Sequence, residues 1–90
     1  KFELSQNYPN PFNPTTTIEY QLPENNPVKL VLYDISGKEV KTLVNEFKPA
    51  GKYEIDFQSA VGNSQFASGV YFYQLKTGNY LETKKMILLR

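Results

Sequence analysis

The sequence contains no cysteine, no histidine and no tryptophan. Without cysteine there is no disulfide and no thiolate chemistry, and without histidine the Ser-His and Cys-His machinery of nucleophilic catalysis is absent. The carboxylates Asp34, Glu54, Asp56 and Glu82 are scattered among turns and outward strand positions, and their spacing matches neither a carboxylate metal loop nor a phosphate-binding glycine motif. We therefore expect a protein that is not an enzyme and that holds no metal and no cofactor.

The chain also lacks a long apolar run and a strong charge of one sign. No stretch approaches the roughly 18 residues of a membrane span, and no basic-plus-apolar leader opens the chain. Ten basic and nine acidic residues leave a net charge of +1, whereas a nucleic-acid-binding domain needs a basic stripe. We therefore expect no nucleic-acid partner and no membrane insertion. The abrupt start at Lys1 suggests a piece of a longer protein.

What the sequence does contain is β-forming residues separated by turns. Seven tyrosines and six phenylalanines in 90 residues fit a β-rich fold of one domain over residues 1–90. No helical periodicity of useful length appears. Strands are expected at residues 1–4, 15–22, 28–34, 38–44, 52–57, 70–76 and 81–89. Their spacing predicts an all-β fold, a small antiparallel immunoglobulin-like β-sandwich of about seven strands.

Residues 28–44 predict a central hairpin whose turn admits two registers. A two-residue Ser36-Gly37 loop pairs Asp34 with Glu39, whereas a three-residue loop with Gly37 in the left-handed conformation pairs Asp34 with Lys38. The second register is favoured because opposite charges meet across the strands and apolar residues meet apolar residues. It sets Leu32 opposite Val40, Leu30 opposite Thr42 and Val28 opposite Val44. The apolar members of these pairs are expected on one buried face: Val28, Leu30, Leu32, Val40 and Val44. Apolar Val31 and Tyr33 on the other face indicate a strand inside a sheet.

Residues 7–17 read N-Y-P-N-P-F-N-P-T-T-T, and their prolines forbid a helix. We expect an ordered, extended loop with trans peptide bonds, in which Tyr8 and Phe12 act as apolar pegs and Asn10 and Asn13 bond their own backbone. Such a loop is a structural cap on one end of the sandwich. This structural role is favoured. The other interpretation is a preformed recognition epitope, since an extended segment loses little entropy on binding.

The last strand becomes purely apolar at residues 86–89, and Lys84, Lys85 and Arg90 bracket it with positive charge. One interpretation is an ordinary final strand. The other is an exposed edge that accepts another chain by strand addition, with an acidic groove as its receptor. A third feature, the tyrosines Tyr33, Tyr71 and Tyr73, suits a sugar-binding platform, but packing in the core is favoured for them.

Five blocks of this sequence, in order, resemble type IX secretion C-terminal sorting domains (type A, Por secretion). They are L-S-Q-N-Y-P-N-P-F-N-P-T-T-T-I (4–18), V-K-L-V-L-Y-D-I-S-G-K-E-V (28–40), P-A-G-K-Y (49–53), A-S-G-V-Y-F-Y-Q-L (67–75) and K-K-M-I-L-L-R (84–90). The resemblance covers nearly the whole chain. The same pattern is similar to the immunoglobulin-like domain of flagellar hook-capping proteins, which implies a fold of that type. The segment Phe57-Gln58-Ser59-Ala60 departs from the family, which often carries a Trp-Asp pair and a Gly-rich turn there.

The resemblance implies a C-terminal secretion signal that is secreted or displayed at the cell surface by way of the periplasm and outer membrane. The implied partners are the type IX translocon and sortase components and a covalently linked N-terminal cargo domain, with sortase cleavage and anchoring to lipopolysaccharide as further steps. The family motif loop comprises Tyr8, Pro9, Asn10, Pro11, Phe12, Asn13 and Pro14. The implied sorting signal comprises Lys84, Lys85, Met86, Ile87, Leu88, Leu89 and Arg90.

Two other functions remain open from the sequence. One is a carbohydrate-binding or adhesion module appended to a secreted hydrolase. The other is an assembly domain that self-associates along its edge strands.

Overall fold

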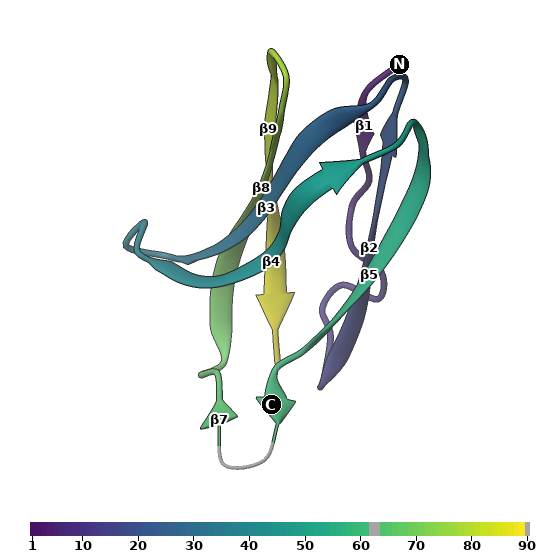
Figure 1. Cartoon of the computed structure of the whole chain (residues 1–90). Helices are drawn as coiled ribbons and strands as arrows, with labels where there is room; N and C mark the ends of the chain where they lie inside the picture. The colour runs from purple at the N-terminus through teal and green to yellow at the C-terminus, as the bar shows by residue number, and fades with distance from the viewer. Residues whose placement is uncertain (62–63, 90) are drawn as a thin grey trace.

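The computed structural model describes residues 1–61 and 64–89, and this part of the chain contains strands and no helix. Two antiparallel sheets pack face to face (Figure 1). The three-stranded sheet has the order β1 (Glu3–Leu4), β2 (Thr15–Leu22), β5 (Gly51–Gln58). The four-stranded sheet has the order β4 (Glu39–Lys48), β3 (Asn26–Asp34), β8 (Gly69–Thr77), β9 (Tyr80–Leu88). The predicted all-β sandwich of about seven strands is confirmed.

Alternating side chains from both sheets fill the core. In β2 the predicted inward residues Ile18, Tyr20 and Leu22 are all buried, while Glu19 is exposed. The facing sheet contributes a matching set from each strand, namely Val28, Leu30, Leu32, Val44, Tyr71, Tyr73, Leu75, Met86 and Leu88. Burial of period-2 apolar positions on two facing sheets is the main stabilising term of such a sandwich.

The turn of the central hairpin forms as predicted. The Asp34 N–H donates to the Lys38 carbonyl (2.9 Å) and the Gly37 N–H donates to the Asp34 carbonyl (2.9 Å), so the loop has three residues. Gly37 has φ of +88°, the left-handed value that this turn requires. The Asp34 carboxylate accepts hydrogen bonds from Ser36 and from the Lys38 N–H, and these lower its pKa.

The predicted register beyond the turn is wrong. Leu32 lies opposite Lys41, Leu30 opposite Val44 and Val28 opposite Glu46, because the register shifts twice along the pair. Each shift leaves one extra residue in β4, first Val40 and then Leu43. Both extra residues are half-buried against the core. The bulges therefore let β4 pack more apolar side chains inward than a regular strand would. Val28, Leu30, Leu32 and Val44, which were also predicted to face inward, are buried. The strand β3 lies between β4 and β8, inside the sheet as expected.

Between β5 and β8, residues 58–68 have the polar and small side chains typical of a loop, and a loop is expected there. This segment carries the short strands β6 (Ala60–Val61) and β7 (Ser64–Gln65). Gly62 of this expected loop lies outside the described residues. Phe66 is half-buried and its ring stacks on Phe57 at 5.3 Å. The side chains of Tyr71 and Tyr73 are buried, and the Tyr71 hydroxyl donates to the Ala67 carbonyl (2.7 Å). Core packing is therefore correct for these two tyrosines.

Candidate functional site

A buried polar network holds the start of the proline-rich loop. Asn7 is only 2% exposed, and its side-chain amide donates to the Thr16 hydroxyl (3.0 Å) and the Pro9 carbonyl (3.2 Å). The Thr16 hydroxyl in turn donates to the Pro9 carbonyl (2.8 Å). From the other sheet, the Tyr73 hydroxyl accepts from the Asn7 N–H and donates to the Ser5 carbonyl, both at 2.7 Å. Each buried polar group here has a partner, which fixes the path of the backbone.

The loop then lies against the outer edge of β9. The Phe12 N–H donates to the Ile87 carbonyl (3.0 Å), and the Leu89 N–H donates to the Phe12 carbonyl (3.1 Å), which makes a short parallel bridge. The Asn10 side chain accepts from the Ile87 N–H (2.9 Å). The Gln6 amide donates to the Lys85 carbonyl (2.7 Å). We call these contacts of Gln6, Asn10 and Phe12 with residues 85–89 the clasp.

Phe12 anchors the clasp in the core. Its side chain is 2% exposed and meets the Phe57 ring edge-on at 5.9 Å. Phe12 is therefore an apolar peg as predicted. Tyr8 is not, because its side chain is 81% exposed while its backbone pairs with Thr17. Asn10 bonds the distant strand rather than its own backbone, which corrects the expectation of a local turn.

The proline peptides also differ from expectation. The Tyr8-Pro9, Asn10-Pro11 and Asn13-Pro14 bonds are cis, so the expectation of trans bonds is wrong. Pro9, Pro11, Asn13 and Pro14 themselves are exposed. The prolines of the motif thus lie on the surface, while the buried contacts come from the residues around them.

The last strand is the edge of the four-stranded sheet, and its two faces differ. Met86 and Leu88 are buried, Ile87 is half-buried and Leu89 is 55% exposed. Lys85 is exposed, whereas Lys84 forms an ion pair with Glu82 (3.2 Å). A hydrogen bond from the Tyr80 hydroxyl and the contact with Lys84 lower the pKa of Glu82. Arg90 lies outside the described residues.

The clasp changes the strand-addition hypothesis for this edge. Strand addition needs N–H and C=O groups that point outward without partners. At Ile87 both outward groups are already bonded to the loop, and at Leu89 the N–H is bonded too. A second chain, including a second copy of this one, would have to displace the loop before pairing there.

Sequence reasoning identified the loop and the last strand separately and missed the residues that join them. Gln6, Asn7, Thr16 and Tyr73 were not predicted as site residues. Asn7 and Thr16 flank the proline run, and this position was a usable signal, since polar side chains beside prolines supply the hydrogen bonds that prolines cannot donate. Nothing local to Tyr73 indicated its partner, which is 66 residues away in the sequence.

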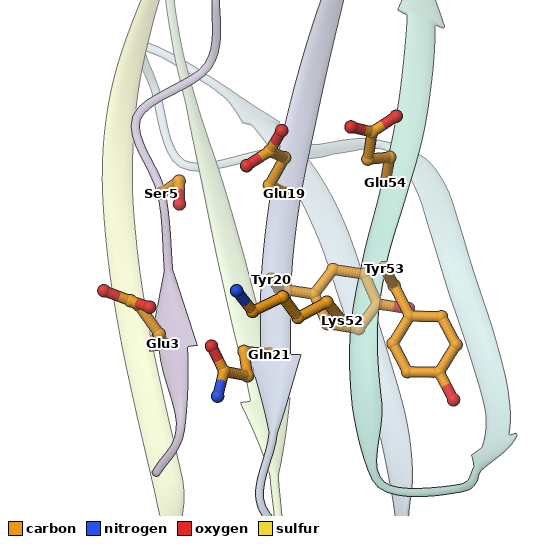
Figure 2. Close-up of a pocket in the computed structure, with 8 residues that line it drawn as sticks. All are labelled: Glu3, Ser5, Glu19, Tyr20, Gln21, Lys52, Tyr53 and Glu54. Carbon is orange, nitrogen blue, oxygen red and sulfur yellow. The ribbon is translucent and has the colours of Figure 1, made fainter.

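A second feature of the surface is an acidic cleft on the outer face of the three-stranded sheet. Glu19 and Glu54 are directly opposite on β2 and β5, and Figure 2 shows their carboxylates side by side. A hydrogen bond between these two carboxyl groups and the negative charge of Glu19 raise the pKa of Glu54.

Within residues 1–61 and 64–89, no group of three or more His, Cys, Asp or Glu side chains is arranged to hold a metal ion. A helix long and apolar enough to cross a membrane is likewise not found in this part of the chain.

The strand order makes this chain an antiparallel β-sandwich, in which a three-stranded sheet faces a four-stranded one. The family described as secretion system C-terminal sorting domain matches residues 6–89, and the chain belongs to this family. A search of curated proteins finds no match to the chain.

Family membership indicates a type IX secretion C-terminal sorting signal, with export to the cell surface or the medium through the outer membrane. It also implies contact with the type IX secretion machinery and attachment to a cargo protein. Domains of this family are in general non-catalytic.

Proposed function

We propose that this domain is a non-catalytic sorting signal that directs an N-terminally linked cargo protein through the type IX translocon. Residues 84–90 carry the sorting information, and the loop of residues 8–14 holds that segment in place. After export, a sortase at the cell surface removes the domain and attaches the cargo. The observation that carries the proposal is the clasp: the proline-rich loop and the last strand, both within the matched residues 6–89, meet in one structure.

The clasp supports this function through preorganisation. A terminal segment that is free in solution loses conformational entropy when a receptor orders it, and this weakens binding. Here the segment is paired with β8 on one side and with the loop on the other. A receptor therefore meets residues 85–89 already fixed in one conformation.

The alternative of a sugar-binding module finds no support in the tyrosines. Such a module needs exposed aromatic faces. Tyr71 and Tyr73 are buried in the core and Tyr33 is half-buried, so the three do not form an exposed platform. We do not retain this function.

Export of a fluorescent cargo tests the proposal. The cargo carries a Sec leader and is fused to residues 1–90 in a bacterium with a working type IX translocon, and the same cargo without the domain is the control. We expect cargo outside the cell only with the domain, and mass spectrometry of the exported cargo should show that the domain has been removed. Periplasmic retention of a folded fusion would refute the sorting function in that host.

A further inference from the structure

The outer face of the four-stranded sheet differs in charge from the rest of the surface. Cross-strand pairing puts Tyr33, Phe72 and Lys85 in one row, and Lys29, Lys76 and Leu81 in another. Their neighbours along β3 and β8 are largely buried. Along β9 Met86 is buried, whereas Tyr80, Glu82 and Lys84 are half-buried. The outward residues of the three adjacent strands β3, β8 and β9 include three lysines and no carboxylate: Lys29, Val31, Tyr33, Val70, Phe72, Gln74, Lys76, Leu81, Thr83, Lys85 and Ile87. Among them Val31 is buried. We call this set the basic face. Glu39 stands beside it on β4.

The opposite side of the sandwich has the reverse character. The outward side chains of β1, β2 and β5 include Glu3, Glu19 and Glu54, with Lys52 as the lysine among them (Figure 2). Asp56 of β5 is a further exposed carboxylate on this side. The net charge is only +1, but the charges are distributed unevenly, so that the molecule has one acidic and one basic face. A field with this polarity orients a protein as it approaches a charged partner.

Exposed apolar side chains gather on the basic face. Leu81 is 59% exposed opposite Lys76, and Leu89 follows the outward Ile87. Beside the basic face, Phe47 of β4 is 63% exposed and lines a groove with Pro27, Lys29, Glu46 and Lys76. Apolar side chains with charged residues around them are the usual anatomy of a protein–protein interface.

We propose that the basic face is the docking surface for a protein of the secretion machinery whose own surface has an apolar centre and an acidic rim. This inference rests on the proposed sorting function and names the surface by which the sorting signal is read. Because the clasp occupies the backbone at Ile87, the receptor reads the side chains of Lys85, Ile87 and Leu89 together with their neighbours on β8. The acidic face points away from the receptor.

Charge reversal on the two faces tests this proposal in the export assay. Lys85→Glu and Lys52→Glu make the same chemical change at exposed lysines on opposite sheets. We expect Lys85→Glu to lower exported cargo by about tenfold, since it sets a like charge against the acidic rim, and Lys52→Glu to leave export at the wild-type level. Circular dichroism checks that both variants remain folded. Leu81→Ser, at an exposed position on the same face, should also reduce export.

The outcomes separate this inference from the function it rests on. If the wild-type fusion is not exported, the sorting function fails. If the wild type is exported and Lys85→Glu matches Lys52→Glu, the sorting function stands and the basic face is not the docking surface. Co-flotation of the purified domain with phosphatidylglycerol vesicles provides a further test. If the wild-type domain binds the vesicles and Lys85→Glu abolishes this binding, the partner of the basic face is an anionic lipid surface, and the proposal of an acidic protein partner is wrong.

Discussion

At the scale of single residues, Tyr73 connects the two sheets. Its hydroxyl bonds both Ser5 and Asn7, and its ring is fully buried. Burial raises the pKa of Tyr73 to about 12, so the hydroxyl stays protonated and able to donate at any physiological pH. One side chain thus fixes the point at which the N-terminal segment leaves β1 and enters the proline-rich loop.

Tyr73→Phe should destabilise the domain by about 1–3 kcal/mol, because the substitution leaves the buried N–H of Asn7 and carbonyl of Ser5 without this partner. Urea denaturation measures the loss as a lower midpoint. Tyr8→Phe is the matched control, since the Tyr8 side chain is largely exposed, and it should change stability little. Equal midpoints for both variants would contradict the role given to the Tyr73 hydroxyl.

The Glu19 and Glu54 pair predicts a pH-dependent effect. Like charges directly opposite on neighbouring strands are destabilising. The pKa of Glu54 is raised in the folded state, which means that the protonated carboxyl group stabilises the fold. This stabilisation is fully present at pH values below the ordinary pKa of Glu54, and it is lost as the pH rises through the raised pKa of the folded state. Glu54→Gln should therefore raise the melting temperature by a few degrees at pH 7 and have a smaller effect near pH 4.

Thermal unfolding at the two pH values, with Glu24→Gln in the exposed turn as control, checks this prediction. The pKa values of Asp34 and Glu82 are lowered, so these two groups make the fold less stable as the pH falls, which is opposite to the effect of Glu54. Each variant is therefore compared with the wild type at the same pH, where the effects of Asp34 and Glu82 are the same in both proteins. A stabilisation by Glu54→Gln that is the same at both pH values would show that like-charge repulsion is not its cause.

At the scale of elements, the clasp makes the proline-rich loop and β9 depend on each other. The loop supplies the acceptor for the Ile87 N–H and the partner for the Leu89 N–H. The loop is itself held by Phe12 in the core and by Asn7 beneath it. The edge of the sheet is thus covered at the end of β9, which is one of the ways that native proteins protect an edge strand.

Asn10→Ala should release the Ile87 amide while the sandwich stays folded. Hydrogen exchange measured by NMR should show at least about tenfold faster exchange at Ile87, because a lost hydrogen bond of about 1.4 kcal/mol corresponds to that factor. The amide of Met86, which alternates to the β8 side, should keep its protection. Asn13→Ala, at an exposed position of the same loop, is the control. Unchanged exchange at Ile87 would mean that the Asn10 side chain does not hold the strand.

At the scale of the whole molecule, the terminal segment belongs to the core as well as to the candidate signal. Met86 and Leu88 are fully buried between the sheets, and Phe12 packs where β9 ends. A sandwich of 90 residues has a single modest core. Loss of two buried side chains and of the clasp removes a large share of its stability.

Deletion of residues 84–90 should therefore abolish cooperative unfolding, with two buried aliphatic side chains worth about 2–5 kcal/mol each. Thermal circular dichroism and protease digestion measure the result. Loss of export after this deletion would then report unfolding, and only outward substitutions such as Lys85→Glu isolate recognition. A truncated domain that melts cooperatively and resists protease would show that the last residues are dispensable for folding.

The sequence by itself determined the seven strands of the two packed sheets, the inward residues of β2 and the three-residue turn at Asp34 to Lys38, because each depends on neighbours a few residues away. Period-2 alternation and turn chemistry are local properties. The family motifs also stood in the sequence, in order and at full length.

Only the tertiary structure decided the register of β4 and the joining of the loop to the last strand. The bulges at Val40 and Leu43 exist because both side chains find space in a core that β4 alone does not define. Asn10 meets Ile87 across 77 residues of chain, and no local pattern can choose between that partner and its own backbone. The two oppositely charged faces likewise appear only when the sheets are packed, since outward side chains alternate with inward ones along each strand.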